Sequence, residues 1–454
     1  MKMCYNIHLK GVDAVKKKWI LLHMLILTAL LFSGCSMRTI DEMYSLPKRS
    51  EAYSDLQSAI DIAMAGLDYS APLTGENQQA VQMADLDGDG QEEYLVFTKG
   101  SFDNPMQILV FTQENGRIQI MEVISSNGTA FDQVEYVEID GKPGYELVVG
   151  RKVSNQLMGS ASVYSFANGR AERLMNAGYS KLLTCDLGSS DQKEVLLIQR
   201  GESDADNAVA VLYRYRSKSM VRSVEVPLSR PALDVKRVAA GKLQCGTPAV
   251  FVSSATDENA IRTDILALRD DVLVKLEYDS VEQAGVQTLR NYYVYPEDVN
   301  EDGIMELPSL LSVNPISASW QMEEQYQVRW YSVDLEGNRT EKRSTFHNYD
   351  CGWYLELDNA WADYVTVYQV GNTYAFYMWN DTYKEAVAVF TLYSLTGSDR
   401  LTQSTEDGRF ALHQSDGVIY AARFESDVTR YGITEEYMIK SFHLIHKDWN
   451  TGET

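Results

Sequence analysis

Short apolar runs separated by polar loops fill the middle of the chain, and one order of them returns five times between residues 76 and 345. In each unit a polar loop leads into an apolar run, and two alternating runs joined by a tight turn follow. Runs of this length and composition between turn residues are typical of β-strands. The apolar runs that follow the loops are 94–97, 147–149, 195–198, 250–252 and 307–311. A strand leading into the loop, an apolar strand and a hairpin predict four strands per unit.

The polar loops keep a regular spacing. We number them loop 1 (85–93), loop 2 (138–146), loop 3 (186–194), loop 4 (241–249) and loop 5 (298–306). Their first residues are separated by 53, 48, 55 and 57 positions. A period near fifty with strands inside it indicates a propeller-type array. We therefore predict a mainly β chain in which residues 76–345 form a β-propeller of about 5–7 four-stranded blades.

Tight turns mark the hairpins inside these units. Asn-Gly pairs favour two-residue hairpin turns, because both turn residues need a positive φ. The predicted turns are Asn115-Gly116, Asn168-Gly169, Ser217-Lys218, Asp270-Asp271 and Gly337-Asn338.

The first 35 residues have a different pattern. A basic stretch ends at Lys16-Lys17-Lys18, an apolar run of fifteen residues spans 19–33, and Leu31-Phe32-Ser33-Gly34-Cys35 follows. Such a run is short for a membrane span and suits a signal sequence. The end of the segment resembles the lipobox of bacterial lipoproteins, although Phe32 stands where Leu is usual.

That resemblance implies that residues 1–35 are a signal peptide and lipobox. In bacterial lipoproteins the cysteine of the lipobox is diacylated and becomes the mature N-terminus. The resemblance therefore implies that Cys35 carries a lipid of the palmitate type. The implied location is the extracytoplasmic face of the cell membrane, in an envelope of the Gram-positive type. An uncleaved signal anchor is the alternative.

Residues 36–75 are expected to form a tether and an amphipathic helix. Leu56, Ala59, Ile60 and Ala63 recur at helical spacing between residues 51 and 65, with Ser50 available as an N-cap and Gly66 as a stop.

The repeat is absent from residues 346–454, which we predict to form a small C-terminal α+β domain. Their sequence pattern resembles a C-terminal module found on other exported Firmicutes proteins. The alternative is that their strands add one or two blades to the array.

Loops 1 and 5 carry oxygen ligands at alternate positions. Positions 1, 3, 5, 7 and 9 hold the ligands, the seventh through its carbonyl, with Gly90 and Gly303 at position 6. A hard cation such as Ca²⁺ needs six or seven such oxygens, and a tight turn delivers them. The predicted ligands are Asp85, Asp87, Asp89, Gln91 and Glu93 in loop 1, and Asp298, Asn300, Asp302, Ile304 and Glu306 in loop 5.

The pattern Asp-x-Asp-x-Asp-Gly-x-x-Glu before a strand resembles the FG-GAP/VCBS repeat of integrin-type β-propellers. An EF-hand is disfavoured, because Val96 and Ser309 occupy its twelfth position. Lys142, Ser190 and Cys245 replace the fifth-position Asp in the other loops, which we expect to be plain turns. A fully ligated Ca²⁺ has no open position for a substrate, so a structural role is expected.

Charge and cysteine content narrow the classes of function. The chain has 454 residues and a net charge of −23, of which residues 1–34 contribute +4, leaving −27 for the remainder. Such a surface repels phosphate backbones, so nucleic acid is not an expected partner. Past Cys35 three cysteines follow, Cys185, Cys245 and Cys351. The sequence leaves open whether Cys185 and Cys245 pair.

No catalytic motif stands out. The chain lacks Gly-x-Ser-x-Gly, His-Glu-x-x-His and Gly-x-x-x-x-Gly-Lys patterns, so no catalytic residue is assigned. His347, His413, His443 and His446 read as surface or core residues. Six tryptophans lie in the last third; rings at strand alternation are usually core, although exposed rings bind sugars. These are Trp320, Trp330, Trp353, Trp361, Trp379 and Trp449.

We therefore expect a membrane-tethered, non-enzymatic binding or scaffolding module with structural calcium and an unidentified protein or glycan ligand. The alternative is a polysaccharide-active enzyme or glycan-binding component at the cell surface. Paired carboxylates converging in a cleft beside His or Tyr would favour the enzyme.

Overall fold

The computed structural model describes ten stretches of the chain. They are residues 51–100, 106–153, 158–188, 192–256, 260–276, 288–290, 294–313, 325–380, 385–426 and 428–445. The predictions for residues 1–50, including Cys35, the tether and the N-cap Ser50, lie outside the described residues, as do Ser190, Trp320, His446 and Trp449. The chain divides into two compact units, Met1–Asp61 and Ile62–Thr454.

Helix α3 (Glu51–Ala63) occupies the described end of the first unit and its boundary with the second. Its predicted span of 51–65 is two residues too long at the C-terminal end. Leu56 and Ile60, four residues apart, are buried, and Gly66 adopts a φ of +83°. A left-handed glycine just past the last turn ends a helix without steric cost. Within the described residues, no helix is long and apolar enough to cross a membrane.

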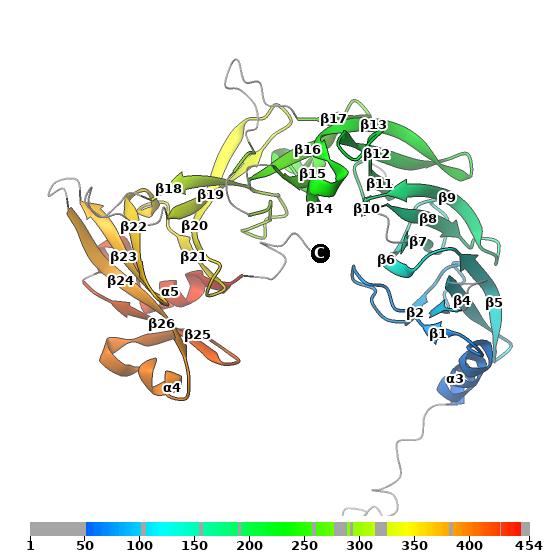
Figure 1. Cartoon of the computed structure of the whole chain (residues 1–454), viewed down its shortest axis with the longest axis horizontal. Coiled ribbons are helices and arrows are strands. Elements are labelled where there is room, and N and C mark those ends of the chain that lie inside the picture. The colour runs from blue at the N-terminus through cyan, green and yellow to red at the C-terminus, as the bar shows by residue number, and fades with distance from the viewer. Residues whose placement is uncertain are drawn as a thin grey trace, which may run out of the picture. The chain divides into compact units, whose positions relative to one another are not determined.

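The second unit contains six antiparallel sheets among its described residues (Figure 1). The first comprises β1 (Asp68–Tyr69), β2 (Val81–Ala84), β3 (Glu93–Lys99), β4 (Met106–Glu114) and β5 (Arg117–Ser126). The second comprises β6 (Ala130–Val137), β7 (Glu146–Lys152), β8 (Gly159–Ser165) and β9 (Glu172–Tyr179). The third comprises β10 (Lys181–Cys185), β11 (Glu194–Gln199), β12 (Asn207–Arg216) and β13 (Ser219–Pro231). The fourth comprises β14 (Val235–Lys242), β15 (Pro248–Ala255), β16 (Ile261–Arg269) and β17 (Val272–Lys275).

The last two sheets include strands from the C-terminal segment. The fifth comprises β18 (Leu307–Ser312), β19 (Tyr326–Val333), β20 (Arg339–Asn348), β21 (Trp353–Leu357) and β27 (Phe442–Leu444). The sixth comprises β22 (Val365–Val370), β23 (Thr373–Asn380), β24 (Glu385–Thr396), β25 (Phe410–Ser415) and β26 (Val418–Phe424). The predicted boundary between residues 345 and 346 falls inside β20, and β21 pairs with β20.

Each sheet packs against the next one along the chain. Mixed cores join the first sheet to the second, the second to the third, and so on to the sixth. At the first interface, the rings of Phe97 and Phe131 meet edge to face at 5.0 Å. Residues Glu194 to Ile198 of β11 are all buried, because a strand inside such a stack is covered on both faces. This arrangement explains the continuous apolar runs and confirms a mainly β, propeller-like fold.

Three of the five predicted hairpin turns are confirmed, at Asn115-Gly116, Ser217-Lys218 and Asp270-Asp271, whereas at Asn168-Gly169 and Gly337-Asn338 only the glycine has a positive φ and the connections are longer than two residues. Asn115 and Gly116 have φ values of 50° and 75°, and Ser217 and Lys218 have 53° and 71°. Two consecutive positive φ values identify the type I′ turn, whose twist matches that of the flanking strands.

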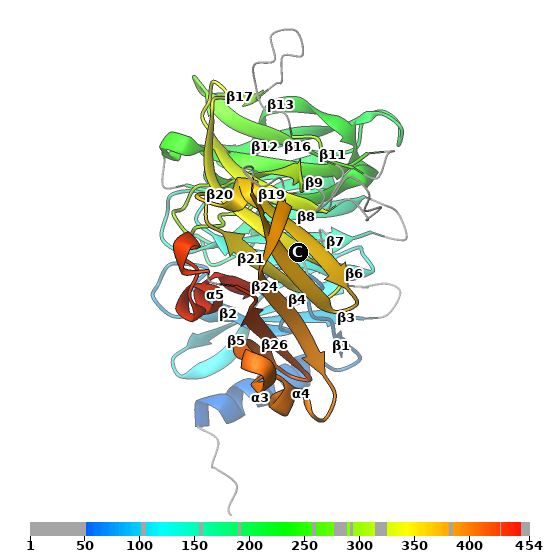
Figure 2. The same ribbon diagram turned by 90° about the vertical axis from the view of Figure 1, so that its left-hand side faces the viewer.

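Short helices complete the C-terminal part of the second unit. They are α4 (Arg400–Gln403), α5 (Glu435–Ser441), and the 3₁₀ turns Ala362–Tyr364, Glu406–Gly408 and Thr429–Tyr431. Helix α5 is capped by Thr434, whose side chain accepts a hydrogen bond from the amide of Tyr437. It lies beside β21 (Figure 2), and the Tyr437 hydroxyl donates to the carbonyl of Glu356. Trp330, Trp353 and Trp361 are fully buried, which confirms the core reading for these three rings.

Candidate metal centres

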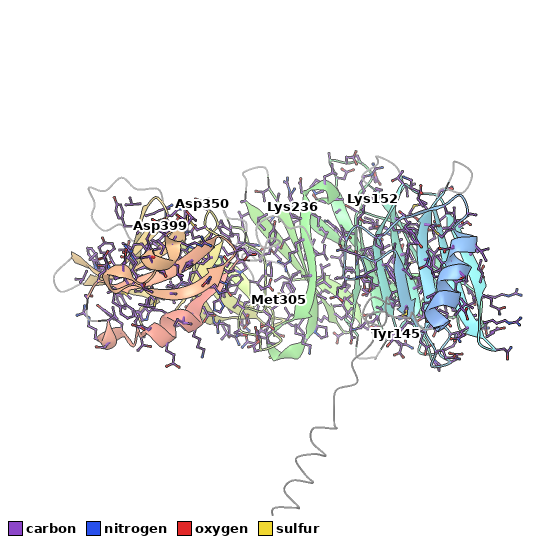
Figure 3. The ribbon with its side chains drawn as sticks, turned by 90° about the horizontal axis from the view of Figure 1, so that it is seen from below. Tyr145, Lys152, Lys236, Met305, Asp350 and Asp399 are labelled. Atoms are coloured by element: carbon purple, nitrogen blue, oxygen red, sulfur yellow. The ribbon has the colours of Figure 1, made fainter. Side chains whose placement is uncertain are left out.

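The polar loops lie at one end of the sheets. Loops 1, 2 and 5 run into β3, β7 and β18, and the end of loop 3 begins β11. Figure 3 shows Tyr145 of loop 2 and Met305 of loop 5 on one side of the sheets, and Lys152 and Lys236 on the opposite side. Loops 2 and 5 therefore lie at the same end of their sheets.

Loop 1 brings three carboxylates together. Asp85, Asp87 and Asp89 each offer an oxygen, and these oxygens all lie within 4.8 Å of one another. Asp85 accepts from the amides of Gly88 at 2.7 Å and Gly90 at 3.0 Å, so its carboxylate closes the turn. Gly90 has a φ of +86°, which favours glycine at this place. Three of the five predicted ligands thus converge.

Loop 5 has the same backbone scaffold. The amide of Gly303 donates to Asp298 at 2.8 Å, as Gly90 does to Asp85. The amide at position 7 donates to the carboxylate at position 5 in both loops, from Ile304 to Asp302 at 2.8 Å and from Gln91 to Asp89 at 2.7 Å. The side-chain amide of Asn300 donates to Asp302 at 3.1 Å. The predicted ligands Asp298, Asn300 and Asp302 are therefore gathered in one turn.

The glutamate at position 9 has a role that the ligand pattern did not reveal. Glu93 is buried and accepts a hydrogen bond from the amide of Leu86, at position 2, at 3.0 Å. The matching glutamates are also buried and accept from the matching amides. The pairs are Glu146 with Ile139 at 2.7 Å, Glu194 with Leu187 at 2.8 Å and Glu306 with Val299 at 3.1 Å. A buried amide needs an acceptor, so this glutamate closes the loop with or without a cation.

Asp87 in loop 1 and Glu306 in loop 5 have raised pKa values, whereas the pKa of Asp302 is lowered, because its burial is outweighed by hydrogen bonds from Ile304 and Asn300 and by the charge of Lys342. Burial, followed by repulsion from Asp89 and Asp85, raises the pKa of Asp87. Burial and the charges of Asp302 and Asp298 raise the pKa of Glu306 to about 7. Groups with these shifts gain when a cation arrives beside them. Lys342 lies 3.5 Å from Asp302, whereas no lysine or arginine of the described stretches pairs with loop 1.

Loops 2 and 3 are each paired with a positive side chain of the protein. In loop 2 Lys142, at position 5, forms an ion pair with Asp140 at position 3. In loop 3 the guanidinium of Arg214, on β12, donates from Nε to Glu194 at 3.1 Å. Both Arg214 and Glu194 are buried. One acidic group of each loop is therefore paired with a positive side chain of the protein.

Neighbouring loops are joined by a repeated backbone hydrogen bond. The carbonyl at position 1 of one loop accepts from the amide at position 8 of the next. Asp85 accepts from Tyr145 at 2.9 Å, and Glu138 accepts from Lys193 at 2.8 Å. An added Cβ on Gly88 would lie 2.4 Å from the Pro143 backbone, so loops 1 and 2 also touch closely.

Loop 4 departs from its predicted register. Met305 of loop 5 donates to the carbonyl of Lys242 at 2.9 Å, which makes Lys242, not Gly241, the counterpart of position 1. Only five residues then separate it from β15, and the 3₁₀ turn Gln244–Gly246 fills the gap. The amide of Leu243 donates to the carbonyl of Thr247 at 2.7 Å in place of a glutamate.

The other chemically notable side chains are dispersed. Cys185, Cys245 and Cys351 are all free, so the open question of a Cys185–Cys245 disulfide is answered by two separate thiols. His347 is buried, and that burial lowers its pKa to about 3. It stacks on Tyr354, which stacks in turn on His443.

Comparison with known proteins identifies no family. No protein-family model and no curated protein matches the chain. Among solved structures, a protein from Lactobacillus plantarum is similar over 70% of this chain and 85% of its own, with 10% sequence identity and a TM-score of 0.33. Any function must therefore be inferred from the chain's own residues.

Proposed function

We propose that the chain is a lipoprotein held by Cys35 at the outer face of the cell membrane, where it acts as a non-enzymatic binding or scaffolding module. Its propeller-like body is built from FG-GAP/VCBS-like repeats, and loops 1 and 5 each hold a structural Ca²⁺. The observation that carries the calcium assignment is the common scaffold of these two loops, with the same hydrogen bonds from positions 6 and 7.

The donor set fits calcium. Carboxylate, amide and carbonyl oxygens in a flexible turn are the ligands that Ca²⁺ prefers. The three carboxylates of loop 1, with oxygens within 4.8 Å of one another, repel one another without a cation. Asp85, Asp87 and Asp89 would hold the ion in loop 1, with the Gln91 carbonyl and Glu93 as further candidates. Asp298, Asn300 and Asp302, with the Ile304 carbonyl and Glu306, are their counterparts.

The position of loop 1 supports a structural role for its ion. The carbonyl of Asp85 accepts the hydrogen bond that joins loop 1 to loop 2, while its carboxylate faces the turn. An ion that fixes Asp85 therefore also fixes the junction between the first two sheets.

The domain division proposed from the sequence assigns residues 36–75 to a tether and helix, 76–345 to the propeller and 346–454 to a C-terminal domain or further blades. The pairing of β20 with β21, and of β21 with β27, supports the second alternative for the last segment. Strands from both sides of residue 345 share one sheet.

Thermal unfolding of the full chain tests the calcium assignment. An ion that binds only the folded state raises the transition temperature. We expect a higher transition temperature in millimolar CaCl₂ than in metal-free buffer, and no such difference in the variant D85N/D89N/D298N/D302N. An absent shift in the native chain, or a full shift in the variant, would refute the assignment.

Membrane fractionation tests the tether separately. We expect the native chain in the membrane fraction and the variant C35S with an unprocessed signal sequence. Processing of C35S to the same product as the native chain would contradict lipidation at this residue.

A further inference from the structure

A pocket of about 210 Å³ lies beside loop 3, where the calcium ligands have been lost. It is formed by Gly188 and residues 192–194 of loop 3, Ile139 of loop 2, the end of β12 and the turn between β16 and β17. Its charged lining consists of Lys193, Glu194, Arg214, Arg216 and Asp271. Three positive and two negative side chains leave it cationic, in a chain whose net charge is −23.

Arg214 is the central group of this pocket. Its side chain is 10% exposed, and its Nε donates to Glu194 at 3.1 Å. Its Nη1 donates to Asp271 at 2.7 Å. Its Nη2 is buried and has no hydrogen-bond partner among the described residues. A buried guanidinium with an unused donor costs free energy, so the site is incomplete as it stands.

Asp271 is the exposed partner of Arg214. It lies in the β16–β17 turn with a φ of +62°, and its side chain is 71% exposed. Arg216 lies 3.9 Å from the same carboxylate. Water can solvate the exposed Asp271 carboxylate once it leaves Arg214, whose side chain is only 10% exposed and then needs another acceptor for Nη1. A ligand carboxylate can supply that acceptor in place of Asp271.

Glu194 cannot leave in the same way. Its second carboxylate oxygen accepts from the Leu187 amide at 2.8 Å, and its side chain is 8% exposed. It holds Nε of Arg214 and so fixes the guanidinium with Nη1 and Nη2 on the other edge. A planar fork fixed in this manner matches the two oxygens of a carboxylate.

We propose that this pocket binds a small carboxylate, which displaces Asp271 and is held by the fork of Arg214, with Arg216 and Lys193 supplying further positive charge. Asp271 acts as the internal stand-in for the ligand. The pocket is smaller than sites for drug-sized ligands, and its volume suits a molecule of monosaccharide size or less. The proposal goes beyond the proposed function, since it requires neither the lipid on Cys35 nor calcium in loops 1 and 5.

Equilibrium dialysis of the full chain in detergent with radiolabelled sodium D-glucuronate tests the proposal, with acetate and D-glucose as competitors at constant ionic strength. The dialysis is run in calcium and again after calcium has been removed on a chelating resin, because soluble chelators are themselves polycarboxylates. We expect saturable glucuronate binding that acetate displaces and glucose does not. If acetate displaces glucuronate as well as unlabelled glucuronate does at the same concentration, a carboxylate alone is sufficient for binding. If acetate displaces glucuronate more weakly, the pocket also recognises the sugar of a sugar acid. Equal displacement by glucose overturns the proposal.

Four variants locate the binding. R214K keeps the charge beside Glu194 but lacks the fork, and we expect its affinity to fall by roughly ten- to a hundredfold. R214Q should lose binding, with its melting curve checking that it folds. D271N removes the stand-in and should bind up to about fivefold more tightly. R222Q changes an exposed arginine that pairs with Glu225 instead, and should bind as the native chain does.

The comparison of these variants can also refute the proposal. Equal affinity of R214K, R222Q and the native chain would place the ligand elsewhere. Absence of binding in both the native chain and D271N would mean that the pocket takes no carboxylate. Loss of binding only after calcium removal would assign the carboxylate to a bound ion and would equally overturn the assignment to Arg214.

Discussion

Loop 1 and loop 3 are closed by the same hydrogen bond, but the negative charge of their acidic side chains is balanced in different ways. In both, a buried glutamate at position 9 accepts from the amide at position 2, through the pairs Glu93–Leu86 and Glu194–Leu187. Loop 1 adds three converging aspartates, whereas loop 3 receives the guanidinium of Arg214 from β12. The shape of the loop therefore depends on the glutamate and on contacts between loops. The positive charge that balances the acidic side chains can come from a bound ion or from the protein.

The largest expected effect is on the internal cation of loop 3. Arg214→Leu leaves Glu194 buried without its positive partner, and we expect the free energy of unfolding to fall by about 3–5 kcal/mol. Urea unfolding of the full chain measures this change. Arg222→Leu is the matched control, because that arginine is 54% exposed, and it should change the same quantity by less than about 0.5 kcal/mol. Equal losses in both variants would contradict the role of Arg214.

The contact between loops 1 and 2 gives the next effect. Gly88 and Gly90 both have positive φ values, 77° and 86°, but only a Cβ on Gly88 meets the Pro143 backbone, at 2.4 Å. We expect Gly88→Ala to lower the free energy of unfolding by about 2–4 kcal/mol, through backbone strain and overpacking together. Gly90→Ala carries the strain alone, about 1 kcal/mol. Similar losses in urea unfolding would show that the two loops do not pack closely.

Loop 5 predicts a smaller, pH-dependent effect. The pKa of Glu306 is raised to about 7 from an ordinary 4.5, so the folded chain keeps a proton that the unfolded chain releases. In metal-free buffer, the contribution of this bound proton to the free energy of unfolding is full below pH 4.5 and is lost as the pH rises through 7. We expect Glu306→Gln, which still accepts from Val299, to lessen the fall in stability between these values by on the order of 1–2 kcal/mol. Identical pH profiles of melting temperature would contradict the shift.

Much of the fold could be predicted from periodicity. Loop spacing, apolar runs and type I′ turn pairs are local signals, and the sheets form where these signals place them. Loop 4 was misplaced by one residue because it lacks the acidic positions that mark the register and is closed by the Thr247 carbonyl instead. A hydrogen bond accepted by a backbone carbonyl cannot be predicted from the identity of the residue.

The candidate site was predictable only where its parts are neighbours in the chain. Asp85, Asp87 and Asp89 are adjacent alternate residues, and they converge. Arg214 meets Glu194 across two strands, which spacing within a loop does not indicate. One signal did exist: Arg214 continues the alternation of Ala210 and Leu212 on the buried side of β12, so a charged residue at that place required a buried partner.

Calcium stoichiometry tests the central claim, that loops 1 and 5 take one ion each, whereas loops 2 and 3, which are paired with Lys142 and Arg214, take none. Equilibrium dialysis of the full chain with radiolabelled calcium counts the ions directly. We expect one bound ion fewer in D85N/D89N, one fewer in D298N/D302N, and no change in the loop 2 variant D140N. An unchanged count in both loop 1 and loop 5 variants, or no bound calcium in the native chain at millimolar concentration, would contradict it.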